Sequence, residues 1–87
     1  MSRFTVEWSP EAEDQLAAIW LRTAPADRPS VNAAQNRIDH DLAADPLGRG
    51  TLIAEDLYSI HVSPLKGYFE IDIAALLVRV TAVAWLI

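Results

Sequence analysis

The chain has 87 residues, of which 52% are hydrophobic and none is cysteine, and its formal net charge is −5. A domain of this size buries only about 60% of its unfolded surface, so we expect one domain spanning residues 1–87. The lack of cysteine excludes disulfides, thiolate metal sites and a cysteine nucleophile, and the negative charge disfavours direct binding to nucleic acid.

The N-terminal segment predicts a strand and then a helix. It has no apolar signal segment, and residues 3–8 alternate between polar and apolar side chains, as a half-buried strand does. Ser9, Pro10 and Glu11 are residue types preferred where a helix begins, so we expect a helix from here to about Thr23. The apolar residues that define its buried face are Ala12, Leu16, Ile19 and Trp20.

A second helix is expected after a short loop. Residues 24–29 contain two prolines, each of which disfavours the helical state of the residue before it, so they predict a loop. Ser30 can cap the following helix, which we expect to end at Asp45-Pro46. Its apolar face is formed by Val31, Ala34, Ile38 and Leu42. The two helices should therefore form a hairpin.

The rest of the chain has the twofold period of strands. Residues 57–62 and 68–73 alternate on either side of a turn at 63–67, and residues 76–87 are apolar on both faces. The predicted fold is α+β, in the order β-α-α-β-β-β, with the helical hairpin on one face of a mainly antiparallel sheet. We expect the core to contain Phe4, Val6, Leu16, Ile19, Trp20, Ile38, Leu42, Ile60, Ile71, Val78 and Val80. The longest apolar stretch, residues 73–78, is far shorter than the roughly 18 residues of a membrane span, so we expect a cytoplasmic protein.

Three segments together resemble the RelE/ParE toxin superfamily, whose members are also described as plasmid stabilisation proteins. Residues 6–20 are similar to the family's opening strand and helix, and residues 41–48 to the stretch that closes its second helix. Residues 57–71 resemble its hairpin, with Tyr-x-Ile-x-Val before the turn and Gly-Tyr after it. The resemblance implies the toxin component of a bacterial type II toxin–antitoxin module, partnered by a cognate antitoxin.

The sequence departs from this family at the positions that cleave RNA. RNA-cleaving members carry Lys or Arg on the first hairpin strand, an Arg after Gly-Tyr, and basic and aromatic residues beyond the last strand. Here Ser59 and His61 stand at the first positions and Phe69 at the next, and the sequence finishes at residues 85–87 without that basic segment. Enzymatic activity is therefore disfavoured.

The remaining candidates for catalysis are isolated residues. His61 could act as a general base near neutral pH, and Lys66, Arg79 or Arg49 could bind an anion. A strand histidine without a spaced Ser or Asp partner is more often a solvated surface residue. We expect no cofactor and no metal, because the acids near the start of the first helix fit helix electrostatics and no coordinating cluster accompanies them.

Three functions follow from the resemblance. The first is a ParE-like toxin that acts by binding a protein target, DNA gyrase, because the nuclease residues are missing. The second is a ribosome-dependent mRNA interferase with substituted catalytic residues, namely His61, Lys66 and Arg79. The third is a repurposed toxin fold that dimerises or binds an antitoxin without toxicity.

The C-terminal strand suggests where a partner binds. An apolar carboxyl terminus exposed to water is unfavourable, so it packs on the helices or meets another protein. Strict alternation would place Leu77, Val83, Trp85 and Ile87 on one face and Val78, Val80 and Leu86 on the other. The residues expected at an interface with an antitoxin or a second copy are Leu77, Val83, Trp85, Leu86 and Ile87.

Overall fold

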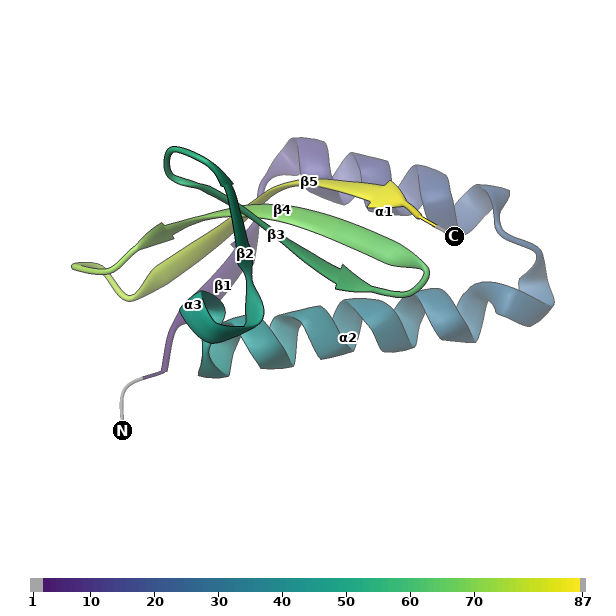
Figure 1. Ribbon diagram of the computed structural model, residues 1–87. Helices are drawn as coiled ribbons and strands as arrows, with labels where there is room; N and C mark the ends of the chain where they lie inside the picture. Colours follow the sequence, from purple (N-terminus) through teal and green to yellow (C-terminus); the bar gives the residue numbers. More distant parts are fainter. Residues whose placement is uncertain (1–2, 87) are drawn as a thin grey trace.

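The computed structural model describes residues 3–86 and contains two long helices and five strands. In chain order its elements are β1 (Thr5–Trp8), α1 (Pro10–Arg22), η1 (Pro25–Asp27), α2 (Arg28–Ala44), α3 (Pro46–Arg49), β2 (Thr51–Ala54), β3 (Leu57–Val62), β4 (Leu65–Asp72) and β5 (Leu77–Trp85). Both long helices lie behind the sheet in Figure 1, and they run in opposite directions. Neither long helix, nor any other helix in residues 3–86, is long and apolar enough to cross a membrane.

The sheet has the strand order β1-β5-β4-β3-β2. The β1–β5 pair is parallel, and the other three pairs are antiparallel. Residues of α1 and α2 join the same hydrophobic cluster as the inward-facing residues of β3, β4 and β5, so both helices cover one sheet face. The predicted α+β class and the mainly antiparallel sheet are therefore confirmed.

The first strand and helix form where the sequence predicts them. Ser9 caps α1, because its hydroxyl accepts a hydrogen bond from the backbone N–H of Ala12 at 3.1 Å. Pro10 occupies the first turn, where its missing N–H costs no helical hydrogen bond. Thr23 closes the helix by donating its hydroxyl to the carbonyl of Ile19 at 2.6 Å.

Three local predictions are wrong. The second helix begins at Arg28 and not after Ser30, because Pro29 lies in its first turn, a position that proline tolerates. The turn of the β3–β4 hairpin is Ser63-Pro64 alone, and residues 65–67 already belong to β4. The predicted order β-α-α-β-β-β omits two short elements in residues 46–54, namely α3 and the strand β2, which pairs with β3.

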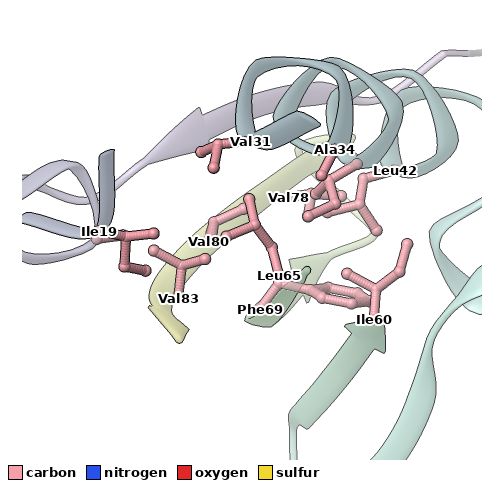
Figure 2. Close-up of a cluster of buried hydrophobic side chains, with 12 residues drawn as sticks. Ile19, Val31, Ala34, Leu42, Ile60, Leu65, Phe69, Val78, Val80 and Val83 are labelled. Carbon is pink, nitrogen blue, oxygen red and sulfur yellow. The ribbon is translucent and has the colours of Figure 1, made fainter. Parts of the chain in front are cut away.

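The core lies between the two helices and the inner sheet face. Figure 2 shows the cluster, which draws its buried side chains from α1, α2, β3, β4 and β5. Six of the predicted core residues are buried, and Phe4, Val6, Leu16, Trp20 and Ile71 are partly buried and pack against them. Phe69 was not in the predicted core, but it is fully buried and its ring stacks on Tyr58, with a centroid distance of 5.5 Å.

A β-bulge in β5 changes which residues face the helices. Tyr68 pairs with Ala82 and Phe69 pairs with Val80, so Thr81 is an extra residue without a partner on β4. The bulge shifts the alternation by one residue, and Val78, Val80 and Val83 are therefore all buried on the inner face. The prediction that Val83 lies on a free face is wrong for this reason.

Beyond Trp8, where β1 ends, the backbone of β5 is hydrogen-bonded by Ser9, which precedes α1, and by Gln15 of α1. The backbone N–H of Ser9 donates to the carbonyl of Val80 at 2.9 Å, and its hydroxyl donates to the carbonyl of Thr81 at 3.3 Å. The N–H of Val83 donates to Oε1 of Gln15 at 2.9 Å. These bonds satisfy strand groups that a sixth strand would otherwise pair with.

The shifted alternation can be tested with a pair of glutamate substitutions. Val83→Glu buries a charge without a partner, so we expect it to lower the free energy of unfolding by about 3 kcal/mol or more. Ala84→Glu, at the adjacent exposed position, should change it by less than about 0.5 kcal/mol. Urea unfolding followed by circular dichroism measures both. The opposite ranking would show that β5 has no bulge.

Candidate functional site

A wide depression lies between α1 and α2. Each helix packs mainly on the sheet, α1 on β5 and β1 and α2 on β1, β3 and β4, while the helices make few contacts with each other. A groove of about 620 Å³ therefore remains open between them. Its apolar lining is formed by Trp8, Leu16, Ala17, Trp20, Leu21 and Val31, and its polar lining by Glu13, Asn32 and Gln35.

Two tryptophans are held in place at opposite ends of this helix groove. At the start of α1, the indole N–H of Trp8 donates to Oδ1 of Asp39 at 2.7 Å. Near the end of α1, the guanidinium of Arg28 lies 4.1 Å from the centre of the Trp20 ring, and its Nε donates to the carbonyl of Trp20 at 3.0 Å. The first contact joins α2 to β1 and the second joins the first residue of α2 to α1, so the groove is formed before any partner arrives.

The helix groove has the chemistry of a site for a protein segment. Leu21 is 68% exposed, and Leu16, Trp8 and Trp20 are only partly buried, so apolar surface remains in contact with water. Covering such surface stabilises a complex by about 25 cal/mol for each Å² removed from water. An amphipathic helix that places its apolar face in a groove is a common form of recognition.

Sequence reasoning did not identify this groove. The sequence predicts that Leu16 and Trp20 lie on the buried face of α1. They are half-buried on that face, and both also line the groove. The available signal was the pair Ala17 and Leu21, which extends the apolar face of α1 beyond the width that one core requires.

His61 lies in a second, smaller depression with two arginines. This depression of about 370 Å³ is lined by Arg37, Asp41, Arg49, Ile60, His61 and Val62. Arg37 is committed to Asp41, because its Nε lies 3.1 Å from Oδ2 of that largely buried carboxylate. Arg49 and His61 are exposed. The structure therefore brings Arg49, His61 and the Arg37–Asp41 ion pair together in one depression.

The three catalytic candidates do not form one site. Lys66 is the cross-strand partner of His61, and its Nζ lies 5.5 Å from the centre of the Tyr68 ring. Arg79 lies in a different depression, where its guanidinium donates to Oε1 of Glu7 at 2.9 and 2.7 Å. The grouping of Arg79 with His61 and Lys66 is therefore wrong, because Arg79 pairs with β1 on another part of the sheet.

The other positions that matched the nuclease residues face away from solvent. Ser59 is buried opposite Tyr68, and Phe69 lies in the core. Neither position presents a side chain that could stabilise a phosphorane. Within residues 3–86, no group of histidine, aspartate and glutamate side chains is arranged to hold a metal ion.

The C-terminal residues expected at an interface divide between two faces. Trp85 pairs with Leu65 of the inner face and lines a depression of about 410 Å³ with Ile19 and the start of the helix–helix loop, where it is 40% exposed. Leu77 is half-buried and Leu86 is 40% exposed. Ile87 lies outside the described residues. The tail thus packs partly on α1, and an interface at Leu77, Trp85 and Leu86 stays a prediction.

Comparison with known proteins identifies the fold. No family model matches the sequence, and no curated protein matches it. Among solved structures, a chain of the RelBE2 toxin–antitoxin complex from Mycobacterium tuberculosis superposes with a TM-score of 0.77 at 22% identity, covering 98% of this chain and 93% of that one.

Two Escherichia coli structures are also similar. The isolated RelE toxin gives a TM-score of 0.63 at 14% identity, over 97% of this chain and 85% of that chain. A chain of the intact RelBE toxin–antitoxin complex gives 0.62 at 14% identity, over 97% and 98%. These likenesses extend over nearly the whole of this chain, and the protein therefore has the RelE-like fold expected from its sequence.

Proposed function

We propose that this chain is the toxin component of a bacterial type II toxin–antitoxin module, that it acts in the cytoplasm by binding proteins, and that it does not cleave RNA. The observation that carries the proposal is the open apolar groove between α1 and α2. The groove occurs in a fold shared with chains of toxin–antitoxin complexes, which supports a cognate antitoxin as its occupant.

The placement of Ser59, Phe69 and Arg79 supports action through a protein target and not through RNA cleavage. Phe69 and Ser59 are buried, and the charge of Arg79 is neutralised by Glu7. The net charge of −5 also opposes the approach of a phosphate backbone. We infer a ParE-like mode of toxicity, in which the target is DNA gyrase.

The group of residues around His61 favours a second candidate function. Arg37, Arg49 and His61 line one depression, and Lys66 is paired across the hairpin from His61. Such a cluster could hold a phosphate while the imidazole moves a proton. This arrangement is that of an mRNA interferase with substituted residues. Arg79 of β5 does not take part in it, because it pairs with Glu7 in another depression.

The antitoxin proposal predicts a defect from one charge placed in the helix groove. Leu21→Asp puts a carboxylate against apolar surface that a partner would cover, so co-purification with the protein encoded by the neighbouring gene should be lost. Ile73→Asp is a matched control, because Ile73 is also an exposed apolar residue, at 55%, and lies outside the groove. Equal co-purification of both variants would contradict binding in the groove.

The two candidate mechanisms predict different activities for the purified protein. We expect inhibition of gyrase supercoiling and no mRNA cleavage, with or without ribosomes, because Ser59 and Phe69 are buried and Arg79 is paired with Glu7, so none of these three positions can stabilise a phosphorane. Cleavage that His61→Ala abolishes and Arg79→Ala leaves intact would instead establish the interferase. The Arg79 variant controls for a general loss of positive charge.

A further inference from the structure

The ends of the helix groove carry different charges. At the Trp8 end, Glu13 lines the groove, and Asp39 is bound to the Trp8 indole through Oδ1. At the Trp20 end, Arg28 lies over the ring and donates to the carbonyls of Trp20 and Leu21. The groove is therefore acidic at one end and cationic at the other.

The acidic end is not neutralised within the chain. The ion pairs found among residues 3–86 are Arg37–Asp41 and Arg79–Glu7, and neither involves the carboxylates at the groove. Arg28 is also the more committed charge, since its guanidinium already contacts a ring and two backbone carbonyls. The net field that a partner meets is therefore negative, in keeping with a chain that carries 12 acidic and 7 basic residues.

We propose that the segment that fills the helix groove is a cationic amphipathic helix of another polypeptide. Its apolar residues, three and four apart, would cover Leu16, Trp20 and Leu21, and its lysines or arginines would lie near Glu13 and Asp39. This inference rests on the proposed function, in which the groove receives an antitoxin, and adds the sign of that partner's charge.

Electrostatic complementarity sets which partner binds and how fast it associates more than it sets the total affinity. The apolar contacts would therefore supply most of the affinity, and the acidic end would select among helices with the same apolar spacing. The preference should weaken as salt is added, because the carboxylate of Glu13 is exposed and is screened by ions.

The test uses the full chain and two synthetic helical peptides with identical leucine spacing. One peptide carries lysine at its flanking positions and the other carries glutamate. Trp8 and Trp20 line the groove, so their fluorescence reports binding. We expect the lysine peptide to bind at least about tenfold more tightly at low salt. Tighter binding of the glutamate peptide, or no binding of either, would overturn the proposal.

A matched pair of variants assigns the effect to the groove. Glu13→Lys should weaken binding of the lysine peptide by about three- to tenfold. Glu11→Lys changes the net charge equally in the same first turn of α1, but Glu11 does not line the groove, so affinity should stay near the wild-type value. Equal losses in both would show that only overall charge matters and would overturn the assignment.

These outcomes are distinct from those that test the proposed function. If the neighbouring gene product co-purifies with the wild type but not with Leu21→Asp, the antitoxin proposal stands whatever the peptides show. A preference for the glutamate peptide would then refute the charge of the partner alone. Circular dichroism of each variant excludes misfolding as the cause of a lost signal.

Discussion

The architecture depends on β5, the strand on which most of the molecule is assembled. It is the second strand of the sheet, pairs with both β1 and β4, and contacts α1 along much of its length. Its bulge at Thr81 lets Val78, Val80 and Val83 all point toward the helices, although regular alternation would turn the last of them away. A strand of nine residues can therefore contribute to the core beneath α1 and beneath α2.

The helix groove follows from the way this strand distributes the helices. Since α1 is fixed to β5 and α2 reaches across to β3 and β4, the helices are held apart over part of their length. Arg28 links the start of α2 to Trp20 of α1, and Asp39 links α2 to Trp8 of β1, so the separation is maintained without filling the space between the helices. The exposed apolar surface is thus a result of how the core is packed, and binding of a partner requires no rearrangement of the sheet.

Much of the fold could be predicted from local chemistry. The capping hydroxyl of Ser9, the helical periods around Ile19 and Ile38, and the twofold period of the last strands are signals carried by single residues and their spacing. In contrast, β2 has only four residues, all exposed, and so shows no buried face that a pattern could reveal. The bulge at Thr81 is a property of how two strands align, and the sequence of β5 fits either alternation.

The candidate site was harder to predict for the same reason. A groove arises from the distance between two helices, which no spacing within either helix specifies. His61, Arg37 and Arg49 share one depression although they come from β3, α2 and α3. Arg79 lies away from them because it pairs with Glu7, which is 72 positions earlier in the sequence. By comparison, Ser59, His61 and Phe69 could be compared with the family pattern directly, because each stands at a position that the resemblance matches.

The hydrogen bonds that close the β5 edge restrict how the sheet can grow. Gln15 and Ser9 occupy backbone groups on that side, while β2 forms the opposite end of the sheet and is exposed throughout its length. Beyond the end of β1, Ser9 and Gln15 therefore take up β5 backbone groups that a strand of a second chain could otherwise pair with. Two identical chains that met at β2 would each use the same edge, so the contact would be a symmetric pair.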